Sequence, residues 1–294
     1  MHHVLRVSEV PLQEPDQDRV HARGYRRAPL VDHGCGAVHT GLGLCQLEAG
    51  GTLDRHLHSY EESFFVLEGD VILELDGRAY RLETGDYGVV QVGVPHGWRN
   101  TADGPARWLE MLSPQPRSHP RDTFFLGGEV PHTAERPDLA DPSVRFLGHF
   151  EDSQLPPPHY LQMDGYSGGN VEGISLKMMV DRVLGAQHLT MFMVEFQPGG
   201  AGNVHDHPFE ECYFLLAGQA DAVLDGKRYR VRAGDVVWTG VGGTHGFFNT
   251  GQTPVRWIET QAPQPPGQQA FRFAADWEHL ERKLGYSSPQ EVRR

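Results

Sequence analysis

One segment of this sequence occurs twice, and that repeat constrains the fold more than any other feature. His56-Leu57-His58-Ser59-Tyr60-Glu61-Glu62 returns as His205-Asp206-His207-Pro208-Phe209-Glu210-Glu211, and Pro95-His96-Gly97-Trp98 returns at the same offset as Thr244-His245-Gly246-Phe247. Residues 56–116 and 205–265 overlay without gaps, and roughly two positions in five are identical. The register continues upstream to His39 and His188. Similarity at a fixed offset indicates duplication, so we expect two copies of one module.

Each copy carries a residue set that suits a transition metal. His56 and His58 lie two positions apart, so on an extended strand their side chains point to the same face. Glu62 keeps that parity, and His96 comes from a distant strand. Three imidazoles and a carboxylate suit a borderline divalent cation better than calcium or magnesium, which prefer oxygen ligands. We predict a site for Fe, Mn, Ni, Co or Zn in each copy, with the ligands His56, His58, Glu62 and His96 in the first and His205, His207, Glu211 and His245 in the second.

The spacing of these residues resembles a known family. H-x-H-x3-E-x6-G ends at Gly69 and Gly218, and G-x10-H-x3-N ends at Asn100 and Asn249. Both patterns are similar to the signature motifs of the cupin superfamily, and two copies resemble a bicupin with two tandem cupin domains. Gln91 and Gly240 replace the proline usual in the second motif, but that proline shapes a turn and is not a ligand. The resemblance implies an all-β fold of two double-stranded β-helix (jelly-roll) barrels, and it is not specific for a reaction.

Local patterns agree with an all-β fold. Residues 63–68 and 71–75 are rich in β-formers, and Asp76-Gly77 after them is a strong hairpin signal that Asp225-Gly226 repeats. Neither repeat has a convincing helical period. The apolar spacing over 271–284 predicts a short C-terminal helix.

The repeat and the proline content predict five segments. Prolines gather between the repeats and disfavour helix interiors, so this stretch is expected to be an extended linker. The predicted segments are an N-terminal arm (1–36), an N-terminal cupin barrel (37–116), a proline-rich linker that packs on the barrels (117–172), a C-terminal cupin barrel (173–270) and a C-terminal helix and tail (271–294).

Composition limits the cellular location and the kinds of partner that we expect for this chain. Three cysteines without a C-x-x-C pair favour a reducing, cytoplasmic location. The start has no apolar signal core and no apolar run reaches about eighteen residues, so no membrane association is expected. A net charge of -13 argues against nucleic acid as a partner. Exposed edge strands favour a homodimer, and a small molecule is the expected substrate.

Four further side chains are candidates for a substrate pocket. Parity places Trp98 and Phe247 on the face of His96 and His245, where they line the cavities or pack in the core. Arg55 and Arg99 flank ligands in the first copy only. If either reaches the cavity, the first site favours an anionic substrate; the alternative is a solvated arginine.

Parity also separates structural residues from ligands. Glu61 and Glu210 precede the ligand glutamates and point the other way, so we expect them on the surface. Cys212 is expected to be a small core residue. Asn100 and Asn249 are expected to stabilise turns and strand ends.

The open coordination positions suggest catalysis. Four protein ligands on a six-coordinate cation leave two positions for substrate or dioxygen, whereas structural sites are closed. The best prediction is a dioxygenase for a small metal-chelating phenolic, enol or keto-acid substrate, with Glu62 or Glu211 as a catalytic base. The alternatives are a non-oxidative bicupin enzyme (a decarboxylase, an isomerase or a ureidoglycine-type aminohydrolase) and a small-molecule-binding cupin without turnover. Bicupin aminohydrolases usually replace one histidine of the working site by glutamine, and here both sites have three histidines.

Overall fold

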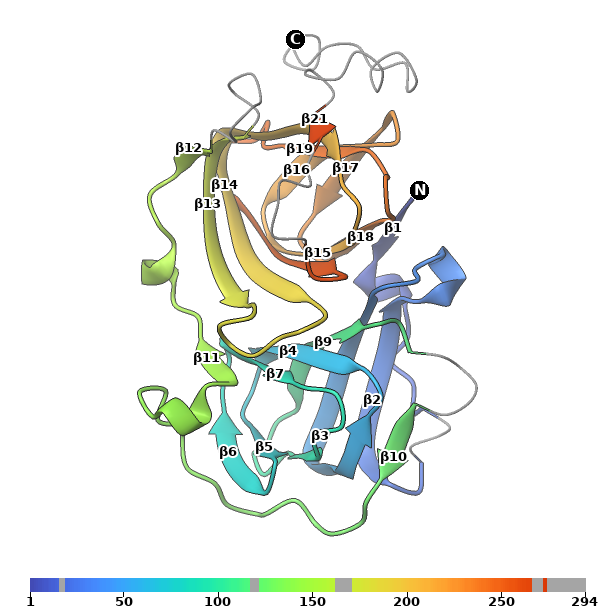
Figure 1. Cartoon of the computed structure of the whole chain (residues 1–294), viewed down its shortest axis with the longest axis vertical. Coiled ribbons are helices and arrows are strands. Elements are labelled where there is room, and N and C mark those ends of the chain that lie inside the picture. The colour runs from blue at the N-terminus through green and yellow to red at the C-terminus, as the bar shows by residue number, and fades with distance from the viewer. Residues whose placement is uncertain (16–18, 117–121, 162–170, 266–271, 274–294) are drawn as a thin grey trace. The chain divides into compact units, whose positions relative to one another are not determined.

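A computed structural model describes residues 1–15, 19–116, 122–161, 171–265 and 272–273. These residues form two sheets of antiparallel strand pairs, each curled into a barrel (Figure 1). The ten-stranded sheet contains β2 (Ala22–Val31), β3 (Gly41–His58), β4 (Glu61–Glu68), β5 (Val71–Leu75), β6 (Arg78–Leu82), β7 (Asp86–Val90), β8 (His96–Arg99), β9 (Ala106–Ser113), β10 (Thr123–Phe125) and β11 (Leu147–His149). The all-β prediction is confirmed.

The eleven-stranded sheet repeats this order with additions at its edges. It contains β1 (His2–Arg6), β12 (His159–Leu161), β13 (Val171–Val180), β14 (Thr190–Asp206), β15 (Glu210–Ala217), β16 (Gln219–Leu224), β17 (Lys227–Arg232), β18 (Asp235–Thr239), β19 (His245–Phe248), β20 (Val255–Ala262) and β21 (Arg272–Phe273). Helical structure in the described residues is limited to the short 3-10 helices η1 (Val7–Glu9), η2 (His33–Cys35), η3 (Pro142–Val144) and η4 (Asp152–Gln154). No described helix is long and apolar enough to cross a bilayer.

The chain divides into two compact units. The N-terminal unit contains Glu9–Glu151 and Met179–Thr190, and the C-terminal unit contains Met1–Ser8, Asp152–Met178 and Met191–Arg294. The first strand of the chain therefore belongs with the second barrel, where β1 pairs with β18. The barrel within each unit is called the N-terminal or the C-terminal barrel accordingly.

The duplication seen in sequence extends further upstream in structure. Strands β2 and β13 begin and end at the offset of the repeat, and Gly24 and Gly173 within them share a φ of 66°. The hairpin residues agree as well: φ is 50° at Asp76 and 45° at Asp225, each followed by a glycine with positive φ. A two-residue turn of this kind needs positive φ at both positions, which explains Asp-Gly.

Short strands from outside the repeats cover the ends of β3 and β14. Strand β10 pairs with β3 and sets Phe125 opposite His56, whereas β21 pairs with β14 and sets Phe273 opposite His205. Residues 272–273 of the predicted C-terminal helix are thus a strand, and the rest of 271–284 lies outside the described residues.

The cores of the two barrels are filled differently along equivalent strands. In the C-terminal barrel, Phe192, Val194 and Phe196 of β14 enter the core with Trp257. At the equivalent positions β3 has Gly43, Cys45 and Leu47. Burying a phenylalanine side chain contributes roughly 1.5–3 kcal/mol to stability, so the N-terminal barrel forgoes such a contribution at Gly43.

Candidate metal centres

Strands β3 and β8 bring three histidines of the N-terminal barrel together. His56 and His58 lie at the end of β3, and the antiparallel pairing of β3 with β8 sets His96 opposite His56. One ligand nitrogen from each ring lies within 4.8 Å of those of the other two. All three side chains are buried, so a single cation can contact all of them.

Glu62 at the start of β4 completes this cluster. Its Oε2 lies 3.2 Å from Nε2 of His58 and 3.4 Å from Nε2 of His96. Among the described residues these are the only polar side chains that contact its carboxylate. The predicted ligands of the first copy therefore converge on one point.

The C-terminal barrel repeats the cluster. His205 and His207 end β14, His245 begins β19, and their ligand nitrogens also lie within 4.8 Å of one another. Oε2 of Glu211 is 2.9 Å from Nε2 of His207 and 3.0 Å from Nε2 of His245.

Backbone and hydroxyl acceptors hold the imidazoles with Nε2 toward the cluster centre. The Nδ1 atoms of His56, His96 and His245 are 2.7, 3.1 and 2.9 Å from the carbonyl oxygens of Asp54, Val94 and Gly243. Nδ1 of His58 is 3.1 Å from Oγ1 of Thr123. When Nδ1 donates these bonds, each Nε2 carries a lone pair aimed at the centre, as a metal ligand requires.

Buried polar atoms test whether a cation fits. Nε2 of His96 and Nε2 of His245 are buried and make no hydrogen bond within the described part of the chain. Each lies near a glutamate oxygen, at 3.4 and 3.0 Å, without forming a hydrogen bond to it, and a shared cation would satisfy nitrogen and carboxylate together. The donor set of three imidazoles and one carboxylate suits a divalent transition metal in each barrel, as predicted.

Electrostatics favour the protonation states that metal binding needs. Burial lowers the pKa of His56 and His205 well below the usual range, and it lowers the pKa of His58 as well. Burial alone would raise the pKa of Glu62 and Glu211, but the nearby imidazoles outweigh it and bring both pKa values below the usual range. Neutral imidazoles and ionised carboxylates are ready ligands.

The two carboxylates differ in what else holds them. In the C-terminal barrel, Tyr213 donates to Oε2 of Glu211 and Nε2 of Gln261 donates to Oε1 at 2.7 Å. The N-terminal barrel has Phe64 and Leu112 at the equivalent positions, and neither side chain can donate a hydrogen bond. Glu211 is therefore fixed at both oxygens, whereas Glu62 is left free of such donors.

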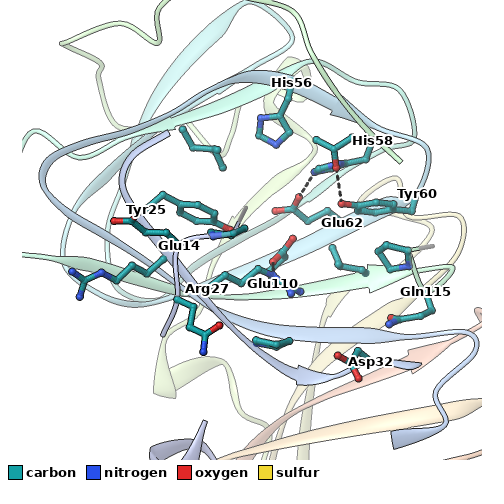
Figure 2. A pocket seen from close by; sticks show the side chains of 18 of the residues that line it. Glu14, Tyr25, Arg27, Asp32, His56, His58, Tyr60, Glu62, Glu110 and Gln115 are labelled. Carbon is teal, nitrogen blue, oxygen red and sulfur yellow. Dashed lines mark hydrogen bonds and ion pairs between the residues drawn. The ribbon is translucent and has the colours of Figure 1, made fainter. Parts of the chain in front are cut away.

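A cavity of about 1040 Å³ opens beside the N-terminal cluster. Its lining includes the predicted ligands His56, His58 and Glu62, and Figure 2 shows these side chains facing the same space as Tyr25 and Tyr60. Five aromatic residues, Tyr25, Tyr60, Trp98, Trp108 and Phe125, line it together with a larger number of polar and charged residues. A site with metal ligands at one point and aromatic side chains around it is typical of a small-molecule pocket.

Of the four side chains predicted for a substrate pocket, Trp98 alone lines the N-terminal cavity. Phe247 packs in the C-terminal core with its ring 4.6 Å from Tyr213. Arg55 forms an ion pair with Glu74 at 2.7 Å, and Nε of the buried Arg99 donates to the carbonyl oxygen of Val130 at 2.6 Å. Neither arginine is among the residues lining this cavity.

The structural roles predicted for two asparagines and one cysteine agree with the structure. The structural role of Asn100 and Asn249 is confirmed: each amide donates to two carbonyl oxygens and accepts from a backbone N–H two residues later. The core position of Cys212 is confirmed.

The surface position predicted for Glu61 and Glu210 is wrong, because both are buried. Glu61 accepts three hydrogen bonds from the backbone N–H groups of Gln187, His188 and Leu189. Parity correctly turned its side chain away from the metal ligands, but the segment Met179–Thr190 of the same unit covers that outer face.

The cavity wall contains a polar group that was not predicted from the sequence. Arg27 and Glu110 form an ion pair there, with Tyr25 and Cys45 next to it. The repeat contained a signal for this group. Arg27 on β2 corresponds to Leu176 on β13, and Gly43 on β3 corresponds to Phe192 on β14, so a polar residue and a small one replace two apolar ones.

The barrels and their histidine clusters define a metal-binding bicupin, and comparison with known proteins agrees. Residues 43–112 and 192–260 each match the cupin domain family. Polyketide synthase CurC from Streptomyces cyaneus is 32% identical over 110 residues, which cover 37% of this chain and 70% of CurC. The chain belongs to the cupin family, as its motifs predicted, and carries two cupin domains in tandem.

Three further likenesses extend over two thirds of the chain or more. Quercetin 2,3-dioxygenase from Bacillus subtilis (strain 168) is 26% identical over 229 residues, 67% of this chain and 66% of the relative. Oxalate decarboxylase from Lactobacillus farciminis, solved as a formate complex, has a TM-score of 0.65 at 19% identity and covers 99% of this chain and 95% of its own. Salicylate 1,2-dioxygenase from Pseudoaminobacter salicylatoxidans, solved with gentisate, has a TM-score of 0.68 at 16% identity, with 89% and 81% covered. At such identities the structural likeness establishes the fold alone.

Proposed function

We propose that this bicupin is a metal-dependent dioxygenase whose substrate binds in the N-terminal barrel. The observation that carries the proposal is the cavity of about 1040 Å³ that reaches His56, His58 and Glu62. Cavities of roughly 300–1,000 Å³ suit drug-sized ligands. A two-carbon diacid would fill a small part of this space, whereas a ring system with a chelating oxygen pair would fill it better.

The walls support an aromatic or enolic substrate. The rings of Trp98 and Trp108 are stacked with centroids 4.6 Å apart, and Phe125 lies against His56 with centroids 5.4 Å apart. Trp98 and Trp108 are each 1% exposed, so the partly exposed ring of Phe125 is the surface on which a flat unsaturated molecule can stack. The relative named as a quercetin 2,3-dioxygenase supports the same substrate class.

In this proposal the histidines bind the metal and Glu62 accepts a proton from the substrate. A redox-active divalent cation bound at this cluster would stabilise an enolate or phenolate oxygen and would supply the electron-transfer chemistry of dioxygen. His56, His58 and His96 hold neutral nitrogens at one point. Glu62, which lacks the two donors that fix Glu211, can turn toward the substrate and accept its acidic proton at a carboxylate oxygen.

The test combines metal analysis with oxygen uptake. Protein purified without chelator is assayed with catechols, flavonols, β-diketones and small keto acids, alongside His56→Ala and His205→Ala. We expect oxygen consumption with an aromatic or enolic chelator, its loss in His56→Ala and its retention in His205→Ala. Substrate consumption that continues under nitrogen would replace this proposal by a non-oxidative bicupin reaction such as decarboxylation.

A further inference from the structure

A buried ion pair lies in the wall of the N-terminal cavity, apart from the metal ligands. Nε of Arg27 on β2 donates to Oε2 of Glu110 on β9 at 2.6 Å, and both residues line the cavity (Figure 2). The side chain of Arg27 is 24% exposed and that of Glu110 is 10% exposed. The pair is therefore largely enclosed and yet open to the space that holds the substrate.

Much of the hydrogen-bonding capacity of this pair is unused. Oε2 of Glu110 also accepts from Sγ of Cys45 at 3.2 Å. No other side-chain hydrogen bond of Arg27 or Glu110 occurs among the described residues, so the Nη groups of Arg27 and Oε1 of Glu110 remain available. Such groups make strong directional contacts when a ligand replaces the water around them.

Glycines on the inner face of β3 make room for polar side chains. A Cβ at Gly43 would lie 2.7 Å from Nη2 and 2.8 Å from Cζ of Arg27, so only glycine leaves space for the guanidinium. A Cβ at Gly41, two positions earlier on the same face, would collide with Oε1 of Gln115. Gln115 also lines the cavity, and its Oε1 is buried and has no hydrogen-bond partner within the described residues.

The C-terminal barrel has no such pair. Leu176 and Phe192 stand in place of Arg27 and Gly43, and Phe192 lies in the apolar core. Glu259, which corresponds to Glu110, accepts from Nε1 of Trp257 at 2.9 Å instead. A buried ion pair is rarely more stable than apolar packing of the same volume, so stability does not explain the exchange of Leu and Phe for Arg and Gly.

We propose that Arg27 and Glu110 determine the specificity of the N-terminal cavity by binding a hydroxyl or keto group of a metal-chelating aromatic substrate, at a point other than its chelating oxygens. This inference rests on the proposed function. The Nη groups donate to the keto or phenol oxygen, and Oε1 of Glu110 accepts from a hydroxyl. A donor next to an acceptor suits a neutral hydroxylated ring better than a second carboxylate, which Glu110 would repel.

The test measures binding preference between two flavonols on zinc-loaded protein, where zinc prevents redox turnover. The probes are 3-hydroxyflavone and quercetin, which share the chelating hydroxyl-ketone and differ in their other ring hydroxyls. We expect wild type to bind quercetin about ten- to hundredfold more tightly by calorimetry. Arg27→Leu, which copies Leu176 of the other barrel, should bind both probes equally and retain its zinc, whereas the exposed Arg23→Leu should keep the preference.

The outcomes separate the inference from the function on which it rests. Equal affinity of wild type for the two probes, or an unchanged preference in Arg27→Leu, overturns the role of Arg27 and Glu110 and leaves the proposed function standing. Absence of binding of either probe to wild type, or binding that persists in His56→Ala, overturns the assignment of the substrate to this site and the inference with it.

Discussion

The phenol of Tyr213 donates a hydrogen bond to Oε2 of Glu211, and Phe64 occupies the equivalent position beside Glu62. Gln261 fixes the other oxygen of Glu211 at 2.7 Å, where the first barrel has Leu112. A carboxylate held at both oxygens keeps one orientation. The two barrels thus combine matching imidazoles with one fixed carboxylate and one that can turn.

This difference predicts that removing the charge of Glu62 and removing that of Glu211 change kcat/KM by different factors. Glu62→Gln should lower kcat/KM about 100-fold or more, since a positioned base is worth roughly 10²–10⁴-fold. Glu211→Gln should leave kcat/KM within about threefold, because its barrel is not the proposed working site. Steady-state oxygen uptake measures both, with metal content determined on the same samples. A larger loss in Glu211→Gln would assign the reaction to the C-terminal barrel.

The two histidine clusters predict independent metal sites. His56→Ala and His205→Ala should each remove about half of the bound metal and leave both barrels folded, because each triad lies within its own unit. Plasma emission spectrometry on dialysed protein measures metal content, and circular dichroism monitors folding. Loss of all metal from a single substitution would show that the sites depend on each other.

The same clusters predict that acid destabilises the metal-free protein. Burial lowers the pKa of His56, His58 and His205 below 6.5, so the unfolded chain gains protons that the folded chain does not as pH falls below that value. Glu62 and Glu211 have pKa values below 4.5, so the stability that they contribute above that value is lost at lower pH. Both effects have the same sign.

Urea midpoints measured between pH 7.5 and 5.0 in the presence of chelator test this. We expect the midpoint to fall steadily toward pH 5.0. A double variant, His56→Gln with His205→Gln, lacks two of the depressed groups and should show a shallower fall. A midpoint that stays constant or rises on acidification would contradict the prediction.

Much of this architecture could be predicted because it depends on local spacing. The parity of His56 and His58 on β3 was enough to predict that they converge, since side chains alternate along a strand, and Glu62 joins them from the next strand, β4. Asp76-Gly77 was enough to predict the hairpin, because the turn itself demands positive φ. In both cases the physical cause lies within a few residues of the signal.

The cavity and the buried outer face could not be predicted in this way. Whether Gly43 leaves a space depends on the side chain that the neighbouring strand β2 places over it, and that side chain is Arg27. Parity placed Glu61 on the outer face, but it carries no information about a distant segment that covers that face. Both outcomes were decided by packing between separate segments of the chain, which spacing within one strand does not reveal.

The contacts of Glu61 lead to a prediction about stability. Its Oε2 accepts from the N–H of Gln187 at 2.7 Å, and its Oε1 accepts from those of His188 and Leu189 at 3.0 and 3.1 Å. Glu61→Ala would leave buried donors without an acceptor, so it should lower the free energy of unfolding of the N-terminal unit by about 2–4 kcal/mol. Urea denaturation measures this loss, and hydrogen exchange should accelerate at the amides of 187–189.

Two matched variants make that result specific to the carboxylate. Glu61→Gln keeps one acceptor oxygen, so it should lose less stability than Glu61→Ala. It should still lose some, because its amide nitrogen faces donors that it cannot satisfy. Glu48→Ala removes a carboxylate whose side chain is 40% exposed, and it should change the free energy of unfolding by less than about 0.5 kcal/mol. If Glu61→Ala behaved like Glu48→Ala, the three hydrogen bonds would not hold this segment on the barrel, and its packing would have to come from apolar contacts such as those of the buried Ala186 and Leu189.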